Sequence, residues 1–338
     1  MSGNVAGDLG TAVPPRSGGI KTIAIFAAKL AVTGACFWYV SRQIELTQVL
    51  AAMALADFRW AAFAILVVMF QIPLVAMRWR NILEALLALD VRMTRTAITA
   101  ITAIAIFFGQ VVPSVASEGL RAWLLVRIGC DWRNALTSVV LDRGVGVALL
   151  IAMGFGILLL PSGIIALGGS RELVLGLYGA LLLAGLLGLW ATPKLVPLLA
   201  GWRYSRWIAA LAADTHRVLL GRKGPLILGI GCLIHVFTIV VVWSLGRAQG
   251  LALPIPDAAV LFVVMIGVAI VPISISGWGL REVAVMSLLG NLGIAPEKAL
   301  LFSVCFGLAL AVGSLPGALV WLLYSVMSAP HPAGRGMT

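Results

Sequence analysis

Two arginines, Arg121 and Arg281, follow similar apolar stretches that are broken by proline. The first stretch reads FFGQVVPSVASEGLRAW over residues 107–123, and the second reads IVPISISGWGLREVAV over residues 270–285. Each contains Val-Pro, then two serines, then Gly-Leu-Arg. An arginine at the centre of a bilayer costs about 2.5–3.5 kcal/mol on insertion scales, so it normally faces a cavity or a partner. A guanidinium matches phosphate oxygens in a bidentate fork. The paired arginines therefore predict a clamp for a phosphate or another anion.

The polar residues around these arginines are candidates for the same site. Serine hydroxyls could contact a ligand, but serines at these positions more often cap the half-helices that begin after each proline. The carboxylates could pair with the arginines or carry protons. The candidate substrate-binding residues are Arg121, Arg281, Ser114, Ser117, Ser274, Ser276 and Gln110. The candidate coupling or pairing residues are Glu118, Glu282, Asp142 and Arg143. The predicted breaks in the helices are Pro113, Gly119, Pro272, Gly277 and Gly279.

A local pairing of each arginine is the alternative to a clamp, and the two interpretations are compatible. Arg121 could pair with Glu118 one helical turn earlier, and Arg281 could pair with Glu282 or a backbone carbonyl. Adjacent residues on a helix do not face each other, so Asp142 and Arg143 each need a partner elsewhere, such as Glu118. His235 is interpreted as a hydrogen-bonded interior residue rather than a proton relay.

The composition is that of a polytopic membrane protein. Of the 338 residues, 61% are hydrophobic and 11% are charged, whereas about 25% are charged in a soluble domain. The net charge of +11 indicates basic cytoplasmic loops beside anionic lipid rather than nucleic acid. The four cysteines predict neither a disulfide framework nor a metal site. The sequence contains no phosphate loop, metal-binding cluster or nucleophile elbow, so no cofactor is expected.

Six apolar segments are long enough to cross a bilayer, and two shorter ones stop at a proline. The predicted spans are 22–40 (with Lys29 facing protein), 60–77, 134–160, 173–191, 226–246 and 299–327, the last with a kink at Gly313–Pro316. The short segments are 96–112 and 258–271. If both short segments crossed, the basic segments 78–95 and 194–223 would lie on opposite sides, against the positive-inside rule. Two re-entrant hairpins place both basic segments in the cytoplasm.

The predicted fold is therefore an all-α membrane protein with six full spans, two re-entrant hairpins and an inverted repeat. Repeat A covers 21–160 and repeat B covers 173–327, within one transmembrane domain over 21–327. Residues 1–20 and 328–338 are predicted cytoplasmic tails, the first of them disordered. The segment 194–223 alternates basic and aromatic residues and is predicted to lie on anionic lipid as an interfacial helix.

The stretch QVVPSVASEGLRAWLLVRIGCDWRNALTSVVLDRGVGV resembles the lysylphosphatidylglycerol synthase transmembrane-region family, also called flippase-like. That family has a polar residue, Pro-Ser, a short acidic turn, Arg-Ala and then an acid-Arg pair, here Asp142-Arg143. Its later Gly-x-Gly-x-Arg-Glu element is similar to Gly277, Gly279, Arg281 and Glu282. The resemblance implies a bacterial inner-membrane protein that moves a lipid between leaflets. Members that make lysyl-lipid carry a further aminoacyl-transfer domain, which this sequence is expected to lack.

Three functions remain open at this point. The first is a translocase for an amphiphile with an anionic or phosphorylated head group. The second is a membrane enzyme that acts on a lipid phosphate or polyprenyl carrier through Glu118, Asp142 and Glu282. The third is a noncatalytic partner of a lipid-modifying enzyme. The expected partners are a membrane lipid, anionic lipids at 194–223 and either a second copy or a lipid-synthesis enzyme, but no nucleic acid.

Overall fold

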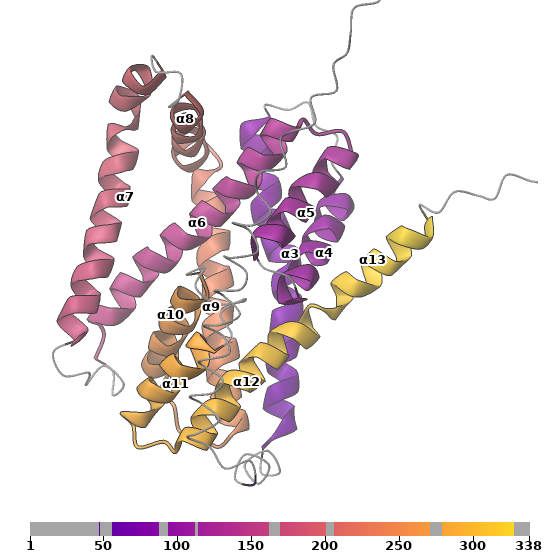
Figure 1. Ribbon diagram of the computed structural model, residues 1–338. Helices are drawn as coiled ribbons and strands as arrows, with labels where there is room; N and C mark the ends of the chain where they lie inside the picture. Colours follow the sequence, from indigo (N-terminus) through magenta and orange to yellow (C-terminus); the bar gives the residue numbers. More distant parts are fainter. Residues whose placement is uncertain are drawn as a thin grey trace, which may run out of the picture.

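The computed structural model describes residues 56–87, 94–111, 114–161, 170–200, 206–270 and 279–327, together with Thr47. Within these ranges the regular elements are all α-helices (Figure 1), which confirms the all-α prediction. The helices are α3 (Phe58–Leu86), α4 (Arg95–Val111), α5 (Ser114–Arg127), α6 (Trp132–Leu159), α7 (Ser170–Ala200), α8 (Arg206–Leu220), α9 (Gly224–Ala248), α10 (Ile255–Ile270), α11 (Leu280–Gly290), α12 (Pro296–Gly313) and α13 (Leu315–Met327).

Five stretches of helix in the described ranges are long and apolar enough to cross a membrane. They are Phe58–Leu86, Trp132–Leu159, Arg171–Lys194, Gly224–Ala248 and Pro296–Leu323, and each overlaps one of the predicted spans. The sixth predicted span, 22–40, lies outside the described residues, as does Lys29. The number of crossings stays a prediction.

Short polar side chains define where three of the helices begin. The Asp57 carboxylate accepts a hydrogen bond from Arg59 N at 2.9 Å, and the Asp131 carboxylate accepts one from Arg133 N at 2.9 Å. The Thr94 hydroxyl accepts a hydrogen bond from Ala97 N at 3.2 Å. Each interaction satisfies a backbone N–H that has no partner within the helix. These caps fix the entry of the chain into α3, α4 and α6.

Helices α3 and α9 form an antiparallel pair at the centre of the fold. Asp57 N, just before α3, donates to the Ala248 carbonyl at the end of α9 at 2.7 Å. At the other end of the pair, Lys223 donates to Glu84. Buried side chains of both helices, including Val68 and Val242, belong to the largest apolar core. Because α3 and α9 occupy corresponding places in the two predicted repeats, their opposite directions are those expected of an inverted repeat.

The two helix pairs that flank the predicted breaks lie in opposite halves of the molecule. Figure 1 shows α4 and α5 side by side in the upper half, and α10 and α11 side by side in the lower half. Helix α13 packs against α4, where a Cβ on Gly317 would lie only 2.0 Å from the Ala103 carbonyl oxygen. Only glycine permits so close an approach of two helices. The re-entrant insertion of the two helix pairs, and the superposition of the two repeats, remain predictions.

The predicted boundaries were wrong in two basic segments. Arg78 and Arg80 belong to α3, which continues past the predicted end of the span at residue 77, because apolar side chains continue at helical spacing to Trp79, Ile82 and Leu83, all of which are buried. The segment 194–223 is not one interfacial helix. Helix α7 continues to Ala200, and the separate helix α8 buries Ala209 and Val218 against the protein. The predicted kink near Gly313 is present as the break between α12 and α13.

The topology gives a labelling prediction. In a background without native cysteines, we expect Glu172→Cys at the start of α7 to react with an impermeant maleimide in intact spheroplasts. Arg222→Cys, beyond α8, should react only after the membrane is permeabilised, because the basic segments are predicted to be cytoplasmic. Labelling of Arg222→Cys in intact spheroplasts, with protection of Glu172→Cys, would reverse the assigned orientation.

The native Cys130 is unsuitable as a reporter in this experiment. It lies between α5 and α6 and is only 6% exposed. Burial, assisted by the neighbouring Asp131 carboxylate, raises the pKa of the Cys130 thiol. Since the thiolate is the reactive form, the native thiol should react slowly with the maleimide.

Candidate functional site

The buried carboxylate of Asp142 joins three helices. Asp142 lies on α6 and is 2% exposed. Its Oδ1 accepts a hydrogen bond from Arg78 Nε of α3 at 2.9 Å, and its Oδ2 accepts one from Arg121 Nη1 of α5 at 2.8 Å. Two charge-assisted hydrogen bonds at these lengths are strong interactions in a buried setting. Asp142 is therefore a fixed anchor for both arginines.

A second carboxylate, Glu118, continues this chain of charges on the side away from Arg78. Its Oε1 accepts a hydrogen bond from Arg143 Nε at 2.5 Å. Its Oε2 lies 3.6 Å from Arg121 Nη1, beyond hydrogen-bond length, and has no hydrogen-bond partner among the described residues. The complete cluster, which we call the Asp142 cluster, consists of Arg78, Glu118, Arg121, Asp142 and Arg143. Three arginines face two carboxylates, so the cluster carries a net positive charge.

Two donor nitrogens of the Arg121 guanidinium have no hydrogen-bond partner among the described residues. Its Cζ lies 3.9 Å from the centroid of the Trp79 ring, and Trp79 Nε1 donates to the Ser138 hydroxyl at 3.2 Å. The stacked indole and Asp142 together fix the plane of the guanidinium. Nε and Nη2 of Arg121 are buried and have no hydrogen-bond partner in the described part of the chain. Buried donors are normally paired, so these two indicate a site for an acceptor.

A small polar cavity lies beside Arg121, between α4, α5 and α6. Its volume is about 160 Å³. The Thr102 hydroxyl oxygen is also buried without a hydrogen-bond partner among the described residues. One water molecule accounts for about 30 Å³ of liquid, so the cavity can hold a group the size of a phosphate but not a whole lipid. The polar residues that line it are Thr102, Gln110, Ser117, Glu118, Arg121 and Arg143.

Arg281 belongs to a different cluster at the start of α11. Its Nη2 donates to Glu282 Oε1 at 2.7 Å, and its Nε donates to the Ser303 hydroxyl of α12 at 3.0 Å. Glu282 is fully buried, and its Oε2 accepts a hydrogen bond from Gly279 N at 2.6 Å. Gly279 caps α11 with a φ of 85°, in the left-handed region that favours glycine. We call Gly279, Arg281, Glu282 and Ser303 the Glu282 cluster.

The structure thus separates the predicted site residues into two groups. Gln110, Ser117, Glu118, Arg121 and Arg143 line one cavity, and Asp142 holds Arg121 from behind. Arg281 and Glu282 lie together near Phe306 in another part of the core. Helices α5 and α11, which carry the two arginines, lie in opposite halves of the molecule in Figure 1.

Two of the predicted positions differ in the structure. Ser117 lies inside α5, which begins at Ser114, so it does not cap the helix; its hydroxyl instead lies close to Gly109 of α4. Gly119 also lies within α5 and is not a break, since the helix is continuous through it. The predicted residues Pro113, Pro272, Ser274, Ser276 and Gly277 lie outside the described residues, and only the backbone of Ser114 is described.

Arg78 and Trp79 were missed by the sequence analysis. Both fall in the basic segment 78–95 that was predicted to follow the span 60–77, yet both are buried and contact Asp142 or Arg121. Two features of the sequence could have revealed them. Apolar residues at helical spacing continue past Arg78, and Asp142 needs a partner that is distant in the sequence. His235 is an interior residue whose Nε2 lies 3.1 Å from the Gly146 carbonyl oxygen. In the described ranges, no group of three or more His, Cys, Asp or Glu side chains could hold a metal ion.

Comparison with known families identifies the chain. The family model described as the lysylphosphatidylglycerol synthase TM region matches residues 26–317. That range includes both arginine clusters and all five candidate spans except the end of the last. A search of curated proteins gave no match. The chain is therefore a multi-pass membrane protein that belongs to the lysylphosphatidylglycerol synthase transmembrane-region family, whose members serve lipid metabolism or transport.

Proposed function

We propose that this protein moves a lipid with an anionic or phosphorylated head group between the leaflets of the membrane. One observation carries the proposal: Arg121 presents two buried donors without a hydrogen-bond partner in the described part of the chain, beside a polar cavity with a net positive charge. A guanidinium fork is suited to two phosphate oxygens, and the low local dielectric strengthens the attraction. The cavity would take the head group, and the acyl chains would remain outside it.

Glu118 is the group that the head group would displace. Asp142 binds Arg121 at 2.8 Å, whereas Glu118 lies 3.6 Å from Arg121 and its side chain is 20% exposed. The weaker, more accessible carboxylate is the one that can move away at lower cost. An incoming phosphate would then pair with Arg121 and Arg143, and Asp142 would hold Arg121 in place throughout. The exchange of one anion for another leaves Arg121 and Arg143 with an anionic partner in both states.

The arrangement of the helices supports transport over the enzymatic alternative. Helices α3 and α9 are antiparallel, and the pairs α4–α5 and α10–α11 lie in opposite halves of the molecule (Figure 1), as expected of a transporter built from inverted repeats. Among the three candidate carboxylates, only Glu118 lines the cavity, and the Asp142 and Glu282 side chains are almost fully buried against their arginine partners. If the protein were instead an enzyme acting on a lipid phosphate, the lipid in reconstituted vesicles would be chemically altered.

The test is lipid transport by Arg121 variants in reconstituted vesicles. At equal protein density, Arg121→Ala should slow the movement of fluorescent phosphatidylglycerol by about 10- to 100-fold, because a hydrogen bond to a charged group contributes about 1.5–3 kcal/mol. Arg121→Lys should recover only part of the rate, since lysine keeps the charge but loses the fork. Gln110→Ala, which removes a cavity residue outside the ion pairs, should reduce the rate less.

Arg127→Ala is the matched control for this series. Arg127 lies on the same helix α5 but is exposed, with its guanidinium 5.1 Å from the Trp123 ring centroid. This variant should transport phosphatidylglycerol at the wild-type rate. Thermal unfolding of each variant in detergent separates loss of fold from loss of transport. Unchanged transport of phosphatidylglycerol by a folded Arg121→Ala protein would refute the proposal.

A further inference from the structure

A larger groove lies at the end of α3 farthest from Arg78. It has a volume of about 810 Å³, within the range of about 300–1,000 Å³ that is typical of small-molecule sites. Its walls come from the start of α3, the end of α9 and the start of α10. The apolar residues that line it are Trp60, Phe63, Ile239, Val240, Trp243 and Ile255, and we call it the Trp60 groove.

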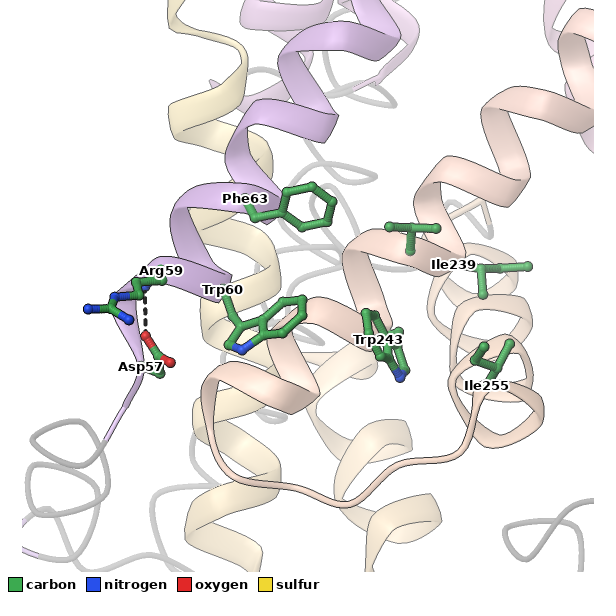
Figure 2. Close-up of a pocket in the computed structure, with 8 residues that line it drawn as sticks. Asp57, Arg59, Trp60, Phe63, Ile239, Trp243 and Ile255 are labelled. Atoms are coloured by element: carbon green, nitrogen blue, oxygen red, sulfur yellow. Dashed lines mark hydrogen bonds between the residues drawn. The ribbon is translucent and has the colours of Figure 1, made fainter.

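Aromatic side chains form the walls of the groove near one rim. Figure 2 shows Trp60 and Phe63 extending from α3 toward Trp243 and Ile239 of α9, with Ile255 beyond them. The Trp60 and Trp243 rings meet edge to face with centroids 5.3 Å apart. The guanidinium carbon of Arg247 lies 5.8 Å from the Trp60 centroid and 5.9 Å from the Trp243 centroid. Tryptophans beside an arginine are typical of the level of the lipid head groups.

The groove and the Asp142 cluster lie at different depths along α3, in different leaflets of the membrane. Trp60 precedes Arg78 by about 27 Å along the helix axis, at a rise of about 1.5 Å per residue. The hydrocarbon core of a bilayer is about 30 Å thick. The groove and the Arg78 end of the Asp142 cluster therefore lie in different leaflets of the membrane. A lipid in the groove would be a second lipid, separate from the one whose head group Arg121 binds.

The charges at the rim favour an anionic occupant. Asp57 and Arg59 also border the groove, and the Arg247 guanidinium lies beside the two tryptophans at its rim. The Asp57 carboxylate already caps α3 through Arg59 N. Within the described ranges, Arg247 forms no ion pair, and its exposed guanidinium is held over the two indoles. Figure 2 shows Arg59 pointing away from Trp60, which leaves Arg247 as the cation at the aromatic rim.

We infer that the Trp60 groove binds one anionic glycerophospholipid. Its phosphate pairs with Arg247, its glycerol region lies against Trp60 and Trp243, and an acyl chain follows Phe63, Ile239 and Val240. The exposed large side chains support an apolar ligand, since Phe63 is 43% and Ile255 is 64% exposed. The bound lipid would hold the starts of α3 and α10 against the end of α9.

Photo-crosslinking identifies what occupies the groove. Benzoylphenylalanine in place of Phe63 should, in vesicles of phosphatidylglycerol and phosphatidylcholine in equal amounts, crosslink mainly to phosphatidylglycerol, as read by intact-protein mass. Arg247→Gln should lower the phosphatidylglycerol adduct about fivefold, the effect of one cation near a lipid surface. Val240→Trp, which fills the groove, should lower adducts with both lipids.

Leu233→Trp is the matched control for the filled groove. Leu233 is an exposed apolar residue on the same face of α9, two helical turns before Val240, and it does not line the groove. It should leave the adducts unchanged. Equal adducts with phosphatidylcholine would overturn the inference, and so would a crosslink to residues 1–55 or to a second copy of the chain. The adducts do not depend on lipid transport, so this test can succeed or fail independently of the Arg121 series.

Discussion

Replacing Asp142 with alanine is expected to lower the free energy of unfolding by about 3–5 kcal/mol, the usual cost of removing one member of a buried ion pair. Asp142 accepts hydrogen bonds from Arg78 and Arg121, and all three side chains are more than nine-tenths buried. The variant leaves two buried guanidiniums without their shared anion. Thermal unfolding in detergent and the yield of folded protein in the membrane measure the loss.

The control for this variant is Asp131→Ala on the same helix. Asp131 is exposed and caps α6 through Arg133 N and Asn134 N, so its removal should cost only about 1 kcal/mol. Asp142→Asn should fall between the two, since the amide keeps the size of the side chain and one acceptor oxygen. A loss no larger in Asp142→Ala than in Asp131→Ala would show that Asp142 is not the anchor of the cluster.

The sequence allowed the fold class, the family and most helix positions to be predicted. Long apolar runs without charges must satisfy their backbone hydrogen bonds as helices in a membrane, and prolines mark where α4 and α10 stop. The prediction failed at Arg78 because a charged residue normally ends an apolar span. Its partner Asp142 lies 64 positions away, and no local pattern reveals such a pair. Helix α7 likewise continues past Lys194, whose ammonium group lies 4.4 Å from the Trp190 ring centroid.

The sequence allowed the types of residue at the candidate site to be predicted, but not which of these residues lie together in space. The repeated Gly-Leu-Arg motif suggested one clamp with two equivalent arginines, because sequence similarity carries no information on the distance between repeats. Arg121 meets carboxylates from its own helix and from α6, while Arg281 meets the carboxylate next to it in the chain. The stacking of Arg121 on Trp79 and the two Arg121 donor nitrogens without a partner among the described residues both depend on the full tertiary structure.

Glu282→Ala should lower the free energy of unfolding by about 3–5 kcal/mol, as Asp142→Ala should, but through a different part of the fold. The buried carboxylate holds Arg281, the Ser303 hydroxyl and the backbone N–H of Gly279. Its loss frees the start of α11 from α12. Hydrogen exchange of the amides in Leu280–Gly290 should therefore accelerate, while exchange in α5 stays at the wild-type rate. Glu297→Ala, at the partly exposed start of α12, should cost only about 0.3–1 kcal/mol through the helix dipole.

A double variant decides whether the two clusters act independently. The Asp142 and Glu282 clusters share no residue, and additivity is expected when two sites have no common partner. The loss in Asp142→Asn/Glu282→Gln should therefore equal the sum of the single losses to within about 0.5 kcal/mol. A larger discrepancy would mean that the two halves are energetically coupled, as a single clamp built from both arginines would require. Additive losses would instead support a mechanism in which Arg121 alone binds the head group and the Glu282 cluster holds the second broken helix in place.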